Sequence, residues 1–387
     1  MARLHRIALI PAALTGAALL VAAIPATAMP DPFPGLPGDR APAAEVWGRP
    51  TRPGSLDLDA QIFAGYHATF LADDQTANAF VLDRAELGAA WRSPDLVGAE
   101  LRTEAVRAAG PNRALGVDGD PLVLRVRRAW AYAGVALGPV DLRFDAGLVA
   151  DPWIGGLEAA YPLRGLAPLL AESGGLFDTS DLGAIANIAA WQDRLQLALA
   201  VTNGEGRSQR EQNEGKSFTA RLGVTAVRTD AGLEVTLHAV YRDGSVGVGE
   251  ARDDRYGAGL TLTHPDATLG ATFAYADGYA GDSDRKALGV EGWADARLLW
   301  DALGVAARYE RLAFEPGQGA EASRQRVSAG VFGDLDGVAH GLRRLRLYLV
   351  YEADTADEGA SPFPGVAEAG DAHRVLLQLE ARAGRVF

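Results

Sequence analysis

The stretch that decides the fold runs from Leu58 to Phe70 and reads LDAQIFAGYHATF. Every second residue in it is apolar, and the residues between them are mostly polar. Side chains of a β-strand alternate between its two faces. The stretch therefore predicts a strand with one apolar face and one polar face.

The same period of two recurs to the end of the chain and predicts sixteen strands. They are longer than the roughly five to six residues usual in soluble sheets, and they suit tilted membrane crossings, which need about 9–11 residues. The expected ranges are 57–70, 77–92, 95–107, 121–134, 139–149, 182–192, 193–202, 215–228, 231–243, 253–264, 266–277, 286–299, 302–313, 323–336, 343–354 and 372–387.

The connections between these strands alternate between short and long. The expected short turns are 93–94, 135–138, 229–230, 265, 300–301 and 337–342. The expected long loops are 71–76, 108–120, 150–181, 203–214, 244–252, 278–285, 314–322 and 355–371. Outer-membrane barrels have short periplasmic turns and long external loops, whereas a soluble sandwich has no reason for this asymmetry. The fold class is therefore all-β, a sixteen-stranded antiparallel transmembrane β-barrel with both termini on the periplasmic side.

The N-terminus has the features of an export signal. A short basic stretch holds Arg3 and Arg6, residues 7–24 carry no charge, and Ala26-Thr27-Ala28 is a small-residue cleavage site. An uncleaved anchor helix is the alternative, because these 18 residues could just span a bilayer. We expect a signal peptide over 1–28, a proline-rich periplasmic linker over 29–56 and the barrel over 57–387.

Composition excludes several classes of function. The formal net charge of −13 argues against nucleic-acid binding, and the lack of cysteine rules out disulfides, zinc–thiolate sites and a thiol nucleophile. The six histidines show no metal-ligand spacing, and no G-x-S-x-G sequence is present. A barrel hydrolase would use His67 or His238, which fall on polar faces, but hydrogen bonding within the wall is the commoner role. We expect no enzyme, no metal and no cofactor.

The last strand resembles the signal that the outer-membrane barrel assembly machinery reads. Its alternate positions are apolar and its final residue is aromatic, and Leu377, Leu379 and Phe387 carry this assembly signal. Aromatic residues near other predicted strand ends, such as Tyr66 and Trp91, suit the interfacial girdles of a membrane barrel.

Five short stretches together carry a family resemblance. They are FVLDRAELG at 80–88, residues 140–149, SDLGA at 180–184, LALAVTNGEG at 197–206 and NEGK at 213–216. In this order they resemble the phosphate-selective porin O and P family of Gram-negative outer membranes and, more loosely, sixteen-stranded general porins. The resemblance implies a sixteen-stranded porin that forms a homotrimer, with its third external loop folded into the lumen.

The predicted third external loop, 150–181, is the longest connection of the barrel. Irregular loops of this length are uncommon and usually functional. It is too apolar to extend into water and also carries charges, which fits a constriction loop whose apolar side chains lie against the wall. An external cap or a trimer contact is the alternative. The candidate constriction residues are Asp151, Trp153, Glu158, Arg164, Glu172 and Asp178.

The polar faces of the strands predict the lining of the lumen. They carry fifteen arginines and fifteen acidic residues, so the wall has charges of both signs. The family's phosphate selectivity rests on a dense inward array of arginine and lysine. The only lysines here are Lys216 and Lys286, so we do not extend phosphate specificity to this chain. The candidate pore-lining residues are Arg84, Arg102, Arg125, Arg127, Arg143, Arg194, Arg221, Arg242, Glu291, Asp295, Arg308, Arg326 and Arg346.

The register of strand 121–134 is ambiguous. Arg125 and Arg127 share one face and Arg128 lies on the other, unless a β-bulge turns all three inward. The run 125–128 is the best candidate for a local anion-attracting patch, and snorkelling rim charges are the alternative.

Together these features favour a porin in the outer membrane of a Gram-negative cell that passively conducts small hydrophilic solutes or ions. A channel specific for anions, phosphate or acidic sugars is one alternative, and a non-conducting structural or adhesion barrel is another. The expected partners are the lipid bilayer and lipopolysaccharide of the outer membrane, the barrel assembly machinery and two further copies in a homotrimer, with no nucleic acid.

Overall fold

The barrel is described by a computed structural model that covers residues 54–71, 74–93, 97–107, 122–207, 214–299, 302–315, 322–335, 342–357 and 370–386. The expected signal peptide, nearly all of the expected linker, and Phe387 lie outside these ranges. Ser55 and Leu56, at the end of the expected linker, already belong to the first strand.

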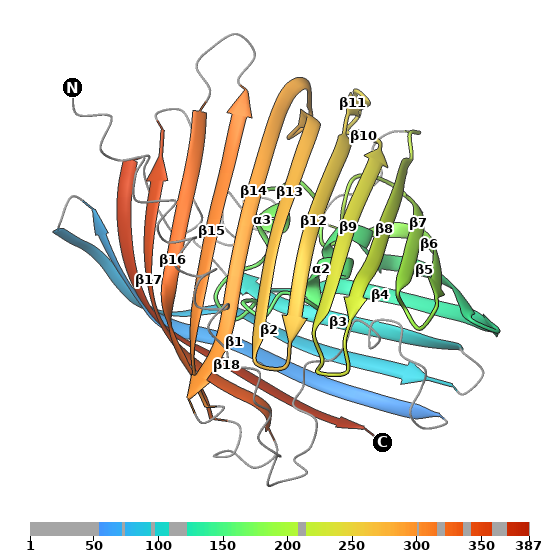
Figure 1. Cartoon of the computed structure of the whole chain (residues 1–387). Coiled ribbons are helices and arrows are strands. Elements are labelled where there is room, and N and C mark those ends of the chain that lie inside the picture. The colour runs from blue at the N-terminus through green and yellow to red at the C-terminus, as the bar shows by residue number, and fades with distance from the viewer. Residues whose placement is uncertain are drawn as a thin grey trace, which may run out of the picture. The chain divides into compact units, whose positions relative to one another are not determined.

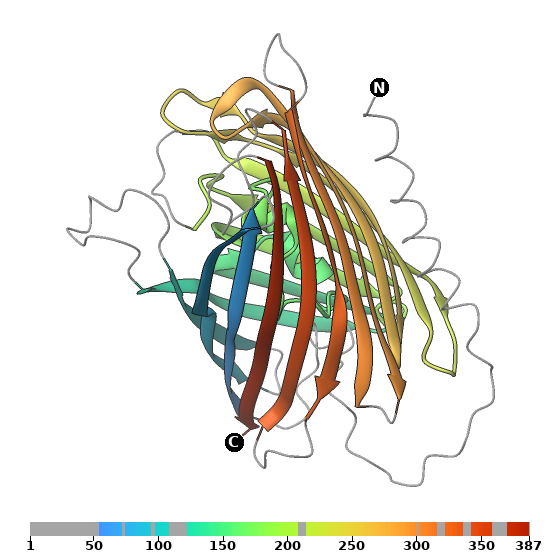
Figure 2. The same cartoon turned by 90° about the vertical axis from the view of Figure 1, so that its left-hand side faces the viewer.

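Sixteen long strands form the barrel, as the alternation predicts (Figures 1 and 2). Neighbouring strands are antiparallel, and the last strand closes the ring against the first, with Gln61 opposite Arg382. The strands are β1 (Ser55–Leu71), β2 (Asp74–Arg92), β3 (Val97–Arg107), β4 (Leu122–Leu137), β5 (Val140–Ala150), β6 (Ser180–Ala190), β7 (Leu195–Thr202), β8 (Ser217–Arg228), β9 (Glu234–Asp243), β12 (Asp254–His264), β13 (Ala267–Tyr279), β14 (Asp282–Leu299), β15 (Leu303–Glu315), β16 (Ala322–Asp334), β17 (Leu342–Ala356) and β18 (Gly370–Val386). A small separate hairpin, β10 (Ser245–Val246) with β11 (Ala251–Arg252), lies between β9 and β12 in the chain.

Two connections that the sequence predicts as long loops, 71–76 and 278–285, are short. Two residues separate β1 from β2, and two separate β13 from β14. In the second turn Ala280 and Gly281 have φ angles of 55° and 79°, the left-handed pair of a type I′ hairpin. The strands extend past the region of apolar alternation because backbone pairing does not require an apolar face.

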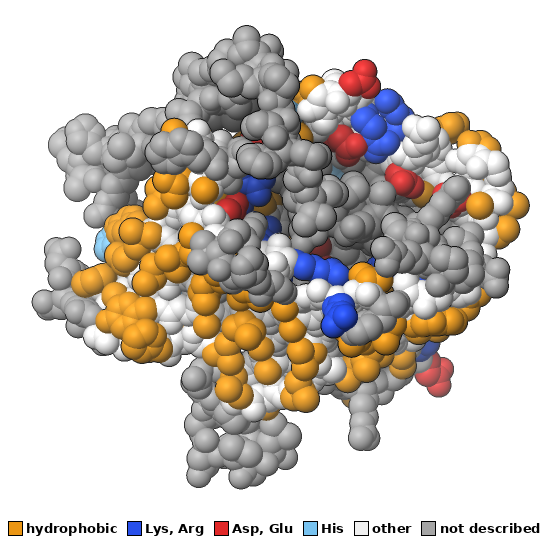
Figure 3. All heavy atoms as spheres, turned by 90° about the horizontal axis from the view of Figure 1, so that it is seen from below, with side chains coloured by type: hydrophobic (Ala, Val, Ile, Leu, Met, Phe, Trp, Pro, Cys, Tyr) orange, Lys and Arg blue, Asp and Glu red, His pale blue; other side chains and the backbone are white. Residues whose placement is uncertain are grey.

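The barrel has charged side chains on its inner face and apolar side chains on its outer face, which is the reverse of a soluble protein. On β8, the inward Arg221 is 2% exposed whereas its outward neighbour Leu222 is 40% exposed. Figure 3, which views the end with the short turns, shows hydrophobic side chains around the outside and charged side chains toward the centre. An apolar surface of this extent is stable against lipid rather than water. Its exposed members include Leu58, Phe80, Leu101, Phe144, Leu237 and Leu349.

A β-bulge resolves the ambiguous register of β4. Arg102 lies opposite Arg128 and Thr103 lies opposite Val126, so Arg127 is the extra residue of the bulge. The arginines on both sides of the bulge and Arg127 itself contact carboxylates inside the barrel. The bulge thus turns all three arginines inward, which is the exception that the sequence leaves open.

The turn between β6 and β7 holds three consecutive non-glycine residues in the left-handed region. Trp191, Gln192 and Asp193 have φ angles of 54°, 59° and 64°. An L-residue is disfavoured in this region by about 1–2 kcal/mol, whereas glycine is not. The turn therefore contains backbone strain that a glycine would relieve.

Gln192→Gly should raise the free energy of unfolding by about 1 kcal/mol, after allowance for the greater freedom of glycine in the unfolded chain. The hydrogen bond from Nη1 of Arg228 goes to the backbone oxygen of residue 192 (2.6 Å) and is retained. Urea titration of the barrel in lipid vesicles measures the change. Ala231→Gly, in the β8–β9 turn without a positive φ, is the control and should give a loss. No gain at residue 192 would mean that the turn is not strained.

Candidate functional site

The residues between β5 and β6 lie inside the ring of strands (Figures 1 and 2). We call residues 151–179 the lumenal segment; it contains α2 (Pro152–Glu158) and α3 (Leu170–Ser173). α2 begins after Asp151, whose carboxylate accepts hydrogen bonds from the backbone N–H groups of Trp153 and Ile154 (2.8 and 3.1 Å). No helix in the described part of the chain is long and apolar enough to cross a bilayer.

Buried apolar side chains hold the lumenal segment against one side of the wall. They form a single cluster with inward side chains of strands from β9 to β18, including Val240, Trp293 and Tyr348. Burial of each such side chain stabilises the docked segment by about 1.5–3 kcal/mol. The most deeply buried members from the segment, none more than 3% exposed, are Trp153, Ile154, Leu157, Tyr161, Leu163, Leu169, Leu170, Leu176 and Phe177.

Hydrogen bonds to the segment's backbone reinforce this attachment. Nε1 of Trp293 donates to the carbonyl oxygen of Ala160 (3.2 Å), and Nη2 of Arg308 donates to that of Pro168 (2.5 Å). Glu291 accepts from the backbone N–H of Leu170 (2.9 Å). The wall thus satisfies backbone groups that an irregular segment would otherwise leave unpaired.

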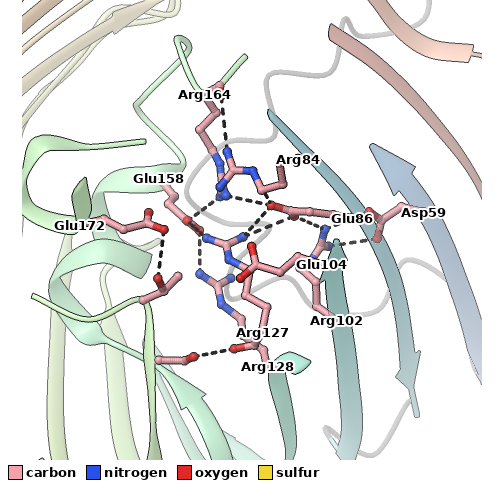
Figure 4. A network of polar contacts seen from close by, with 12 residues as sticks. Asp59, Arg84, Glu86, Arg102, Glu104, Arg127, Arg128, Glu158, Arg164 and Glu172 are labelled. Atoms are coloured by element: carbon pink, nitrogen blue, oxygen red, sulfur yellow. Dashed lines mark hydrogen bonds and ion pairs between the residues drawn. The ribbon is translucent and has the colours of Figure 1, made fainter. Parts of the chain in front are cut away.

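On the other side of the lumen an ion-pair network joins the segment to β2, β3 and β4 (Figure 4). Glu158 of α2 contacts Arg127, Arg128 (2.7 Å) and Arg164 (2.5 Å). Glu86 of β2 contacts Arg164 at 3.1 Å and Arg127 at 3.3 Å, so the same two arginines bridge both carboxylates. The network therefore connects a helix of the segment with the opposite wall through charged groups.

Arginine outnumbers carboxylate in this network and its direct neighbours. Among the described residues, ion pairs form two adjoining groups, one around Glu86 and Glu158 and a second in which Arg125 and Arg207 share Glu104. The two groups together hold seven arginines and five acidic residues, a local excess of two positive charges. The arginines are Arg84, Arg102, Arg125, Arg127, Arg128, Arg164 and Arg207, and the acids are Asp59, Glu86, Glu100, Glu104 and Glu158. The excess lies on the strands that contain the predicted anion-attracting run 125–128.

The candidate pore-lining residues lie on inward strand faces, with the exception of Arg194. Arg194 is exposed in the turn before β7, because the strand begins at Leu195. Most of the others are held in ion pairs; Arg308 contacts Glu291 and Glu310 at 2.8 and 2.7 Å. Most of these side chains therefore contact neighbours of opposite charge more than they contact water.

The candidate constriction residues have different surroundings. Trp153 is fully buried in the apolar cluster, and Asp151 caps α2. Glu172 accepts a hydrogen bond from the hydroxyl of Thr179 (3.0 Å). Of the six, Glu158 and Arg164 are the ones that join the network on β2–β4.

Sequence reasoning missed the wall aromatics that hold the segment. Trp293 and Tyr348 occupy inward positions between charged residues, and the hydroxyl of Tyr348 lies 3.5 Å from the carbonyl oxygen of Pro162. The sequence signal that could have revealed them is an aromatic residue on an otherwise polar strand face. Such a residue indicates that something apolar covers it inside the barrel.

Two histidines of the described strands face inward and take part in wall hydrogen bonds. His238 lies between Arg221 and Thr261, each 2.9 Å from one ring nitrogen, and His67 lies 3.0 Å from the amide oxygen of Gln378. Among the described residues, no group of three or more histidine or acidic side chains could hold a metal ion.

Burial affects ionisation in the lumenal segment. It raises the pKa of Asp151 to about 6, although Arg242 and the N–H groups of Ile154 and Trp153 act in the opposite direction. Burial also opposes ionisation of Glu158, but its three arginine partners outweigh it and hold the pKa of that carboxyl well below its usual range. Glu158 is therefore charged at neutral pH, whereas Asp151 titrates within the pH range of an experiment.

Asp151→Asn should remove a pH dependence of segment docking. A carboxyl with a raised pKa favours the docked state in acid, and this stabilisation is lost as pH rises through about 6. The pKa of Asp151 lies about two units above that of an exposed aspartate, which limits this stabilisation to about 3 kcal/mol. Asparagine keeps the helix cap without a charge. Hydrogen-exchange protection of α2 amides, corrected for intrinsic rates, should fall between pH 5 and 7.5 in the wild type only. A parallel fall in the variant would rule out Asp151 as its origin.

Comparison with known proteins shows similarity of structure rather than of sequence. No family model matches the chain, and no curated protein matches it. OmpT of Vibrio cholerae superimposes with a TM-score of 0.55 at 14% identity, covering 87% of this chain and 99% of that one. An anion-selective porin from Comamonas acidovorans gives 0.56 at 11% identity, covering 85% and 99%.

A third solved structure is OmpF of Salmonella typhi in complex with daunomycin. It superimposes with a TM-score of 0.58 at 14% identity, covering 84% of this chain and 98% of that one. At these identities the likeness establishes a shared fold, the sixteen-stranded porin barrel, over nearly the full length of the known structures.

Proposed function

We propose that the protein is an outer-membrane porin that forms a water-filled channel for passive diffusion of small hydrophilic solutes or ions. The observation that carries the proposal is the pairing of an exposed apolar outer face with a charged inner face on a closed barrel. This arrangement places lipid outside and water inside. The likeness to porin barrels supports the same function.

The lumenal segment is the proposed constriction. It lies inside the barrel and contacts strands on both sides of the lumen, through the apolar cluster and through the ion-pair network. A segment in this position narrows the path of any solute.

A preference for anions is the second candidate function. The network on β2–β4 carries two more arginines than carboxylates, and fixed charge at a narrow point attracts ions of opposite sign. Specificity for phosphate has less support, because the chain has two lysines and its lumenal arginines are mostly paired with acids.

Recordings from the purified barrel in planar lipid bilayers test both proposals. Stepwise conductance is expected, and the reversal potential in a potassium chloride gradient gives the selectivity. A small shift toward the chloride equilibrium potential would support the anion preference, and none would support an unselective pore. Correctly folded protein that inserts without conductance would overturn the porin proposal and leave a structural or adhesion barrel.

Location and assembly are further parts of the proposal. We place the mature protein in the outer membrane, in contact with lipid and lipopolysaccharide, after cleavage near residue 28. Leu377 and Leu379 face outward on β18, as an assembly signal read by the barrel assembly machinery requires. The homotrimer rests on the family resemblance. Intact mass of membrane-extracted protein tests the cleavage, and light scattering in detergent tests the trimer.

A further inference from the structure

The lumenal segment bridges the barrel from one wall to the wall opposite. β4 and β14 lie eight strands apart in the ring of sixteen. Glu158 contacts Arg127 and Arg128 of β4, whereas the carbonyl oxygen of Ala160 accepts a hydrogen bond from Trp293 of β14. Residues 158–160, together with the side chains that reach them from β4 and β14, therefore bridge the lumen.

The two attachments differ in kind. On the β14–β18 side the segment is held by buried apolar side chains, including Tyr161 and Leu163. On the β2–β4 side the contacts of the described residues are polar: the ion pairs of Glu158 and Arg164, and a long hydrogen bond from Nη2 of Arg84 to the carbonyl oxygen of Arg164 (3.5 Å). Exposing apolar side chains to water is costly, whereas charged groups that separate can be hydrated in place of each other. The polar attachment is thus the one that can open.

Water reaches this wall on both sides of the ion pairs but hardly between them. Toward the long loops, the side chains of Asp83 and Arg125 are 41% and 40% exposed, and toward the short turns that of Glu100 is 23% exposed. Between these positions Glu86 and Arg127 are each 1% exposed. Two water-accessible regions therefore meet at the network of Figure 4.

We propose that the ion pairs of Glu158 and Arg164 with Glu86, Arg127 and Arg128 form a latch that gates the channel. The channel opens when these side chains separate and water fills the gap along β2–β4, while the segment's backbone stays on the β14–β18 wall. This inference rests on the proposed porin function and adds to it a closed state.

Glu158→Gln tests the latch directly. The change removes the carboxylate that three arginines share and leaves Glu86 as the carboxylate that Arg127 and Arg164 still have in common, so the larger excess of positive charge favours the hydrated, open arrangement. In single-channel recordings the ratio of open to closed time should rise at least about tenfold. Glu234→Gln, which breaks an ion pair with Arg228 at the end of the barrel, is the matched control and should leave the ratio unchanged.

An engineered disulfide tests whether the segment stays attached to β18 while the channel opens. A Cβ added at Gly165 would lie 3.1 Å from Cβ of Glu380 on β18, close to the roughly 3.5–4.5 Å separation found in disulfides. The chain has no cysteine, so Gly165→Cys with Glu380→Cys introduces a single pair. The oxidised variant should open as often as the reduced one, with each single variant as a control.

The outcomes separate the latch from the porin proposal. A wild type that is open nearly all the time, together with unchanged gating in Glu158→Gln, would overturn the latch and leave the porin intact. Loss of opening on oxidation of the cysteine pair would mean that the segment leaves the β18 wall, which also overturns it. If neither wild type nor Glu158→Gln conducts, although both fold and insert into the bilayer, the porin proposal itself is overturned.

Discussion

Replacing residues 155–175 by a short Gly/Ser turn should raise the single-channel conductance by a factor of about two or more, because a sixteen-stranded barrel without an internal segment leaves a wide aqueous channel. The two ends that the turn must join are held near each other. The rings of Trp153 and Phe177 are 6.0 Å apart, and the backbone N–H of Asp151 donates to the carbonyl oxygen of Thr179 (3.0 Å). These contacts keep the two cut ends together.

Conductance in planar bilayers measures the effect, and heat-modifiable migration on gels confirms that the barrel has folded. Shortening the β10–β11 hairpin at residues 247–250 is the control, because it removes chain of a similar kind outside the segment. Should the shortened variant insert normally and conduct no more than wild type, the lumenal segment is not the constriction. An external cap or a trimer contact would then explain its length.

The strands could be predicted because a barrel repeats one local rule. Period-two alternation needs only neighbours in sequence, so all sixteen long strands were found without knowledge of the tertiary structure. The rule weakens at strand ends, where Asp74, Gln75, Asp282 and Ser283 carry no apolar face, and the predicted loops 71–76 and 278–285 were wrong for this reason. The β10–β11 hairpin was missed because strands of two residues show no period.

The sequence predicted which face of its strand each candidate residue occupies, but it did not predict which residues contact one another. Alternation placed Arg102 and Arg221 inward, and both lie inward. It treated the four acidic residues of the segment as equivalent channel charges, whereas each has its own surroundings. Their partners depend on the path of the segment across the lumen, and no periodic pattern encodes that path. The bulge at Arg127 likewise depends on pairing with β3.

The alternation of apolar and polar residues also could not predict how tightly side chains pack inside the barrel. Alternation alone predicts that Ala198, an inward residue of β7, would tolerate an arginine. In the structure Ala198 is 3% exposed and packs with Val149, Ile185 and the partly buried Trp130. An arginine there would overpack the cluster, which typically costs about 1–3 kcal/mol. Facing the lumen therefore does not by itself make a position tolerant.

Leu199→Arg should have a larger effect than Ala198→Arg, although the two positions are adjacent. Leu199 faces outward at the middle of β7, opposite Ala186 of β6 and Ala220 of β8, where a charge would meet lipid rather than water. An arginine on the lipid face costs about 2–4 kcal/mol at the bilayer midplane. Urea titration in lipid vesicles measures the loss, with Leu199→Ala as the control that removes the side chain without adding a charge. The alanine variant should lose less, because a small apolar residue remains compatible with lipid. An arginine variant as stable as wild type would show that this face of β7 does not contact lipid.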